Sequence, residues 1–560
     1  MKKTLIGLLS LVLACSLAAC TGGGNSQPPA GDGSSAASQG ASASGTEGGT
    51  ADQKIVWAIH NEADTLDPGI SNSTFASPVL MNCYEGLMTY DADNNLVPGV
   101  AESYTVSDDG TEYVFTLRDG LKWSDGTDLT ADDFIYAWTR VITPETGGKF
   151  SSLITDYVLN AKEFFTGAAA IEDVGFEALN AKTIQINTNA PIPYFLDVLV
   201  TFTWFPVKKD VVEASPDAWA KNADTFVCNG PFMASAITIG EGYVLVKNEN
   251  YYNADKVKLQ EINMRLIPDQ ATAVTAFESG EIDGLYEVAY DDIPRLKAES
   301  DEMYSISQFA HTYYIFNTKS GPLEDPRVRK ALSLAIDRNQ LIENVLQTTD
   351  KYATGIVSTG YMVEGIDYTD GRPDYEIQGG ANLELAKQYL ADAGYPGGEG
   401  FPKLTLSYYT NPNIKKLTEA MQQMWKENLG IDMDIATEEW KVYYDNVQAH
   451  NYDIAAMGWG ADYLHPITFL ECFISDSVNN NSQYANERYD ALIREAMGIT
   501  DPVKGKELML QGEQILIGED MALIPLYYRS RVLMMSDSVD GWFLTPLNIM
   551  YFKDAVELDS

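Results

Sequence analysis

The sequence predicts an α/β protein that is divided into two or three lobes. The chain has 560 residues, whereas a single hydrophobic core stops growing at about 250 to 300 residues. Its composition, 45% hydrophobic and 21% charged, is ordinary for a globular protein with large cores. Between residues 383 and 458, short apolar stretches alternate with stretches of helical periodicity. This alternation favours a mainly parallel sheet covered by helices.

The composition also excludes some classes of partner. The 38 lysines and arginines are outnumbered by 80 aspartates and glutamates, which gives a net charge of −42. We expect no nucleic-acid partner, because such proteins present a basic surface. The acidic residues are scattered, as on a solvated surface. No Cys-x-x-Cys pair occurs, and no two of the four histidines have ligand spacing, so we expect no metal site and no cofactor.

Residues 1–19 have the order of a signal peptide: positive charge, an apolar segment, then Leu17-Ala18-Ala19 before Cys20. This ending resembles the lipobox of bacterial lipoproteins, which implies cleavage before Cys20 and lipidation of that residue, palmitate included. Two or more acyl chains hold a protein stably on a membrane. The alternative is an ordinary secretory leader with an incidental cysteine. Residues 20–52, rich in Gly, Ser, Ala and Thr, are predicted to form a flexible linker.

The predicted folded part begins with a strand at Lys54–Ile59, and the alternation in Thr111–Leu117 predicts a half-buried strand. Thr130 and Asp133 have the spacing of a capping box, ahead of a helix with an apolar face. Further helices are predicted to begin after the N-caps Asp269 and Asp325 and to cover 383–393 and 414–429. Strands are predicted at 404–408, 431–435, 453–458 and 523–528.

The stretch Gly458-Trp459-Gly460-Ala461-Asp462-Tyr463 closes one of these strands. The two glycines, Gly458 and Gly460, let a ligand approach the backbone closely, and Trp459 and Tyr463 offer flat apolar walls. Asp462 supplies one fixed negative charge, which suits a cationic amine. The alternative is a turn in which Asp462 caps the next helix.

Several distinct short motifs lie along the folded part: Tyr84-Glu85-Gly86-Leu87, Pro98-Gly99-Val100-Ala101-Glu102, Trp123-Ser124-Asp125-Gly126, Asn229-Gly230-Pro231-Phe232 and Asp325-Pro326-Arg327-Val328-Arg329. Together they resemble the extracellular solute-binding proteins of the peptide/nickel ABC importer family, most of all its oligopeptide-binding members of the Opp type. The resemblance covers residue 54 to the carboxyl terminus. It implies a bilobal clamp of the periplasmic-binding-protein type, with mixed sheets and an extra subdomain in the first lobe.

The resemblance also implies boundaries and a function. The first lobe would comprise residues 53–309 with a subdomain inserted at about 86–220, and the second lobe 310–529. Residues 530–560 would return to the first lobe. The protein would be a monomer, anchored at the outer face of a bacterial membrane. It would capture oligopeptides between its lobes and deliver them to the permease subunits of an ABC importer.

In this family a single aspartate binds the amino terminus of the ligand, and the motif places that role on Asp462. Tyr528 and Thr74 are weaker candidates for ligand contact. Some relatives carry an arginine just before the Gly-Trp pair that binds the ligand carboxylate. Here the neighbours are Ala455-Ala456-Met457, so the residue that would hold the carboxyl terminus is left open.

Other interpretations remain open at this point. Related proteins bind oligosaccharides, haem or nickel complexes with the same fold. A glycosidase or peptidase is not expected, because no Gly-x-Ser-x-Gly elbow or P-loop is found. Paired acids such as Glu438-Glu439 and Asp132-Asp133 are present, but neighbours in sequence point apart on a strand or helix, and a solvated face is the alternative. A surface adhesin or sensor would share the clamp. Beyond the leader, Cys83, Cys228 and Cys472 permit one disulfide at most.

Overall fold

The structure is a computed structural model that describes residues 53–363 and 365–558. These residues belong to one compact unit. The predicted signal peptide, the linker and Cys20 lie outside the described residues. Within the described part, no helix is both long enough and apolar enough to cross a membrane.

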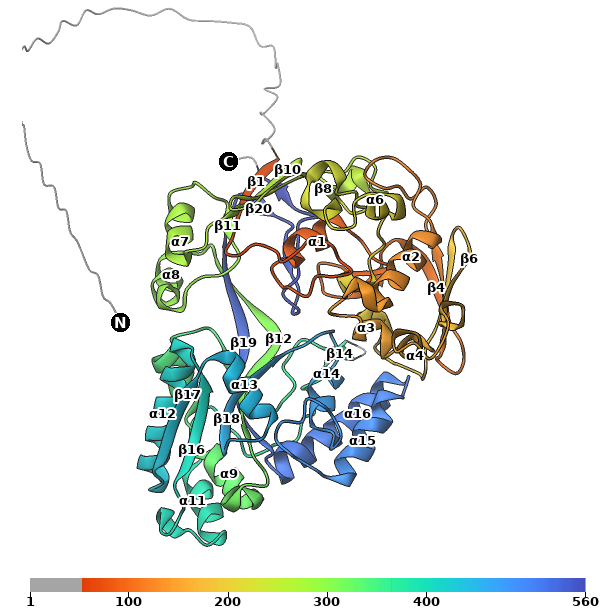
Figure 1. Cartoon of the computed structure of the whole chain (residues 1–560). Helices are drawn as coiled ribbons and strands as arrows, with labels where there is room; N and C mark the ends of the chain where they lie inside the picture. Colours follow the sequence, from red (N-terminus) through yellow and green to blue (C-terminus); the bar gives the residue numbers. More distant parts are fainter. Residues whose placement is uncertain (1–52, 364, 559–560) are drawn as a thin grey trace, which may run out of the picture. The chain divides into compact units, whose positions relative to one another are not determined.

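The central element is an 11-stranded sheet (Figure 1). Its strand order is β17 (Met433–Glu438), β16 (Leu404–Tyr409), β18 (Ile454–Gly460), β12 (Met303–Phe316), β19 (Leu523–Met535), β11 (Gly284–Leu285), β1 (Lys54–Ile59), β10 (Glu261–Leu266), β9 (Gly242–Lys247) and β8 (Phe232–Thr238), and β13 (Lys351–Tyr352) pairs with β19. We call the part around β1 and β8–β11 the first lobe and the part around β16–β18 the second lobe.

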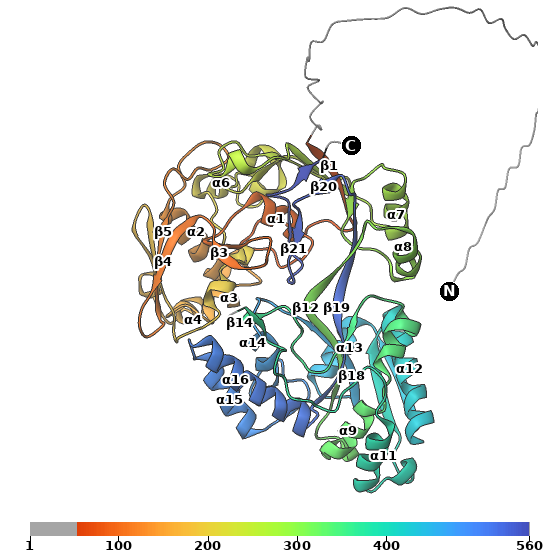
Figure 2. The same ribbon diagram turned by 180° about the vertical axis from the view of Figure 1, so that it is seen from behind.

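The two longest strands, β12 and β19, are paired antiparallel and run through both lobes (Figures 1 and 2). Their register shifts between Ser307 and His311, opposite residues 528–530. Such an irregularity breaks the ladder locally and bends the strands. The boundaries expected at 309–310 and 529–530 stay a prediction, and they fall on or next to this irregular segment.

A separate four-stranded sheet lies beside the first lobe, in the order β4 (Ala101–Val106), β5 (Glu112–Leu117), β7 (Thr183–Asn187) and β6 (Phe176–Asn180). Helix α2 (Ala131–Ile142) packs against it. The predicted capping box at its start is present, because the backbone N–H of Thr130 donates to Asp133 Oδ2 at 2.8 Å. The predicted apolar face of α2 is buried, and Trp138 on it has no exposed surface. We call this part the subdomain.

In the second lobe, β16 pairs in parallel with both β17 and β18, whereas β12 and β18 are antiparallel. The sheet is therefore mixed, and the predicted α/β clamp with mixed sheets is confirmed. The helices of this lobe are α9 (Pro326–Leu334), α10 (Arg338–Gln340), α11 (Leu383–Asp392), α12 (Pro412–Leu429), α13 (Trp440–Gln448), α14 (Ile467–Leu470), α15 (Glu487–Met497) and α16 (Pro502–Glu513). The first lobe adds α1 (Ser77–Cys83), α7 (Gln270–Glu278) and α8 (Ile293–Glu299), and the subdomain adds α3 (Ser152–Thr155) and α5 (Phe195–Val198).

The N-cap predictions are confirmed at Asp269 and Asp325, whose side chains accept hydrogen bonds from the backbone N–H groups of Thr272 and Arg327. Other expected boundaries differ. Strand β17 begins at Met433, two residues late, because the N–H of Ile431 still bonds to Trp425 O in the cap of α12. Strand β18 continues to Gly460, and β19 continues seven residues past Tyr528 to Met535.

The three cysteines of the described part, Cys83, Cys228 and Cys472, are free and buried. The Cys83 and Cys228 side chains are neighbours that share a hydrogen bond, and burial raises the pKa of the Cys83 thiol. Thiols with a raised pKa are poor nucleophiles. The burial of Cys83 therefore indicates a packing role for this thiol.

Candidate ligand-binding site

The carboxyl end of β18 has one unpaired edge. On one side, all seven residues from Ile454 to Gly460 pair with β12. On the other side, β16 pairs only with Ile454 and Ala455 and ends at Tyr409. From Met457 to Gly460, therefore, this edge of the strand has no partner strand among the described residues. An extended chain can add to such an edge by main-chain hydrogen bonds.

A cavity of about 260 Å³ lies where β18 ends. Ala461 and Asp462 line it from the second lobe. From the first lobe and the subdomain it is lined by residues of the 72–77 segment, of α3, of α5 and of the region that follows α5, including Asn72, Ser73, Thr74, Asp197 and Thr203. We call it the Asp462 cavity. It brings together two of the predicted site residues, Thr74 and Asp462.

Asp462 has the properties of an uncompensated charge. Among the described residues, its carboxylate makes no hydrogen bond and no ion pair, and its backbone N–H donates to Thr468 Oγ1 at 3.4 Å. It does not cap the next helix, because α14 begins after Pro466 with no side-chain cap. Asp462 is accessible to solvent and lines the cavity. The protein atoms that surround its carboxylate nevertheless remove part of its hydration. The resulting desolvation raises its pKa to about 6.

The aromatic candidates next to Asp462 have different surroundings. Trp459 is half-buried, and its indole N–H donates to Thr468 Oγ1 at 3.3 Å. Tyr463 is buried and stacks on Tyr194 of the subdomain, with ring centroids 4.7 Å apart and planes within 2°. Its hydroxyl donates to Glu471 Oε1 at 3.1 Å. Tyr463 thus joins the second lobe to the subdomain at the side of the cavity.

Tyr528 lies outside the Asp462 cavity. Its hydroxyl accepts from Arg372 Nη1 at 2.8 Å and donates to the carbonyl oxygen of Gly355 at 3.1 Å. Both contacts are within the second lobe, where Arg372 also forms an ion pair with the buried Glu513 at 3.0 Å. The Tyr528 hydroxyl is therefore hydrogen-bonded within the second lobe. The neighbouring Tyr527 lines a different cavity.

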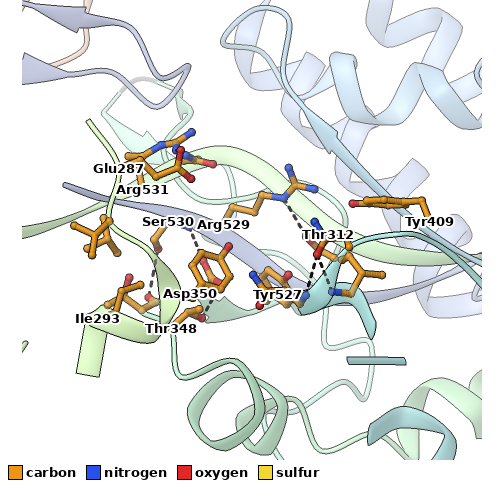
Figure 3. Close-up of a pocket in the computed structure, with 18 residues that line it drawn as sticks. Glu287, Ile293, Thr312, Thr348, Asp350, Tyr409, Tyr527, Arg529, Ser530 and Arg531 are labelled. Carbon is orange, nitrogen blue, oxygen red and sulfur yellow. Dashed lines mark hydrogen bonds and ion pairs between the residues drawn. The ribbon is translucent and has the colours of Figure 1, made fainter. Parts of the chain in front are cut away.

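This second cavity, of about 220 Å³, lies beside β12 and β19 (Figure 3). We call it the Arg529 cavity. Arg529 Nε donates to Thr312 Oγ1 at 3.0 Å. Arg531 pairs with Glu287 at 2.7 Å. Asp350 accepts from the N–H of Ser530 at 2.7 Å, and burial raises its pKa to about 6.

Several polar residues in these cavities were not expected from the sequence, Asp197 and Arg529 among them. Asp197 lines the Asp462 cavity, accepts a hydrogen bond from the Tyr90 hydroxyl at 3.3 Å, and has a pKa raised by burial to about 7. Arg529 lines the second. Each interrupts an apolar run, which is the signal that could have found them. No lysine, arginine or histidine is among the described residues that line the Asp462 cavity, so this cavity favours cationic groups.

The fold and the cavities define a class: a two-lobed binding protein whose ligand lies between lobes joined by two long strands. The chain belongs to the bacterial extracellular solute-binding proteins, family 5, whose profile matches residues 95–481. It is 32% identical to the oligopeptide-binding protein OppA of Bacillus subtilis over 508 residues, which cover 89% of this chain and 91% of that protein. The family resemblance found in the sequence is therefore confirmed.

Two solved structures of relatives, one without ligand and one with a bound peptide, are similar in fold to this chain. One is the unliganded open form of the periplasmic murein tripeptide-binding protein MppA, with a TM-score of 0.80 and 30% identity over 91% of this chain and 98% of that chain. The other is Haemophilus influenzae OppA in complex with the peptide RPPGFSPFR, with a TM-score of 0.69 and 29% identity over 91% of this chain and 99% of that chain. These relatives are named as binding proteins, not as enzymes.

Proposed function

We propose that this protein captures oligopeptides between its two lobes and is the substrate-binding subunit of an ABC importer. The observation that carries the proposal is the combination at the end of β18 of an unpaired strand edge and the uncompensated carboxylate of Asp462. The edge can form backbone hydrogen bonds with any extended peptide, whatever the side chains of that peptide are. The carboxylate holds the protonated α-amine, because a desolvated ammonium needs a fixed opposite charge.

Ligand capture closes the lobes. The structure is more similar to the unliganded open relative than to the peptide complex, although the two identities are nearly equal. This supports assigning the described arrangement to the open state. A ligand that contacts both lobes favours the closed state, because those contacts exist only there. Small-angle X-ray scattering is expected to show a smaller radius of gyration with peptide, and an unchanged radius at saturating peptide contradicts closure.

The amine role is tested by calorimetric titration with tetra-alanine and with its N-acetylated form. N-acetylation removes the positive charge and should weaken binding by about 10-fold or more, as expected for a charge-assisted hydrogen bond. Asp462→Asn should weaken the binding of the free-amine peptide by a similar factor and leave the affinity for the acetylated peptide unchanged. Equal affinity of the wild type for both peptides would refute the role of Asp462.

The same titration decides between classes of ligand and function. Binding of cello-oligosaccharides without any binding of peptides would favour a sugar-binding member of the fold. Cleaved peptide or released reducing sugar in the incubated sample would favour an enzyme. We expect neither, and we expect the recovered peptide to be intact.

The proposal includes anchoring at the outer face of the membrane through lipid on Cys20. The lipobox-like sequence supports it. In cells, Cys20→Ala should move the protein from the membrane fraction to the soluble fraction outside the cytoplasm. Retention of the variant on the membrane would contradict lipid anchoring. The partner of the anchored protein would be the permease, which receives the closed, loaded form.

A further inference from the structure

The proposed function leaves one end of the ligand without a binding residue. If the α-amine binds Asp462 and the main chain pairs with the free edge of β18, the ligand runs back past Gly460 and Trp459 towards Gly458. The second lobe has only Ala455, Ala456 and Met457 ahead of Gly458 on this strand. A ligand carboxylate at that place needs a cation supplied by another element.

Arg529 reaches this place from β19. A Cβ at Gly458 would collide with Arg529 Nη2, so the guanidinium rests against the glycine backbone. Its Nε is held by Thr312 of the intervening strand β12. In Figure 3 the side chain extends away from Arg531 and Glu287 and towards Tyr409. Tyr409 is the last residue of β16, beside which the free edge of β18 begins.

The Arg529 guanidinium is a cation without an anion. Among the described residues, its Nη atoms form no hydrogen bond or ion pair. The nearby acids are engaged elsewhere: Glu287 pairs with Arg531, and the Asp350 oxygens accept from Ser530 N–H and the Thr348 hydroxyl. The side chain is half-buried. A partly desolvated cation is unfavourable unless an anion meets it, and a planar guanidinium binds a carboxylate with two parallel hydrogen bonds.

We propose that Arg529 binds the terminal carboxylate of the peptide and thereby sets the preferred ligand length. This rests on the proposed function. Gly458 lies in β18, and Asp462 follows two residues after the end of that strand. If the chain stays extended from Gly458 to Asp462, at a rise of about 3.3 Å per residue the two are separated by at most about 13 Å. An extended peptide spans about 3.3 to 3.6 Å per residue, so a free peptide held at both ends has about four residues.

The first test compares tetra-alanine as the free acid and as the C-terminal amide, both with a free amine, by calorimetric titration. Amidation should weaken binding to the wild type by about 10- to 100-fold, the range of a charge-assisted hydrogen bond. Arg529→Gln should bind both forms with the weaker affinity, so that amidation no longer matters. Arg327→Gln removes the same charge from an exposed site on α9 and should retain the full amide effect.

The second test is a series of free-acid alanine peptides from two to nine residues. The wild type should bind best at about four residues, and Arg529→Gln should lose that maximum while N-acetylation still weakens binding. An amide effect that is equal in the wild type and Arg529→Gln, or a flat length series in the wild type, would overturn the role of Arg529 and leave the proposed function standing. Failure of every peptide to bind would overturn both.

Discussion

The pKa of Asp462 makes peptide affinity depend on pH in a range where an ordinary aspartate would not. In the free protein its pKa is about 6, and only the ionised form attracts an amine. With this pKa the carboxylate is about nine-tenths ionised at pH 7 and about one-tenth ionised at pH 5, so the dissociation constant should rise about 10-fold. With an ordinary pKa near 3.8, the ionised fraction would change by only about 6% over the same range.

The assay is calorimetric titration with tetra-alanine at pH 7, 6 and 5. This ligand suits the purpose, because its amine stays protonated and its carboxylate stays ionised across the range. Other groups near the site also titrate: Asp197 and Glu471, both with pKa values raised by burial to about 7, and Asp350 of the Arg529 cavity, with a pKa raised by burial to about 6. Asp462→Asn keeps all three, so it reports their contribution alone.

The expected result is an about 10-fold loss of affinity for tetra-alanine between pH 7 and pH 5 in the wild type, and a small change of affinity in Asp462→Asn. A loss of less than twofold in the wild type would show that desolvation does not raise this pKa in the free protein. A loss of equal size in both proteins would place the titrating group elsewhere in the cavity. Either result refutes the reasoning from desolvation.

Three further predictions concern stability and the Arg529 cavity. Glu513→Gln should lower the free energy of unfolding in urea by about 3 to 5 kcal/mol, because it leaves Arg372 buried without its anion; a loss below about 1 kcal/mol contradicts this. Gly458→Ala should displace the end of the Arg529 side chain and abolish the preference for free-acid over amidated peptide, with an unchanged melting temperature as its control. Asp197→Asn should be more stable than the wild type at pH 8. The folded protein holds the Asp197 proton more tightly than the unfolded chain, so the wild type loses stability as pH rises from about 4 to about 7; the advantage of the variant should vanish near pH 4.

The elements that the sequence predicted well are those whose signals are local. Asp269 and Asp325 cap their helices as expected, because an N-cap needs only a side chain and N–H groups two or three residues away. Strand β1 has the predicted bounds because its apolar run is buried on both faces. The family was predictable for a similar reason, since its motifs are short and contiguous.

Elements that depend on partners were less predictable. The apolar run at 523–528 predicted a strand, but β19 continues through Arg529, Ser530 and Arg531. Ser530 and Arg531 are extended because they pair with Ser307 and Ile306 of β12, whereas Arg529 lies in the irregular step of that ladder. Nothing within the run itself specifies that pairing. Likewise Tyr463 was expected to wall the ligand site, whereas its stacking on Tyr194 depends on how the subdomain meets the second lobe.

The sequence by itself determined the class of the protein, the local starts of its helices and Asp462 as the candidate for binding an amine. Only the tertiary structure showed that Thr74 and Asp197 face the same cavity as Asp462, and that Arg529 lies against Gly458. The reason is physical. Capping and hydrophobic periodicity act over a few residues, whereas a binding site joins side chains from strands and loops that meet only when the sheet has formed.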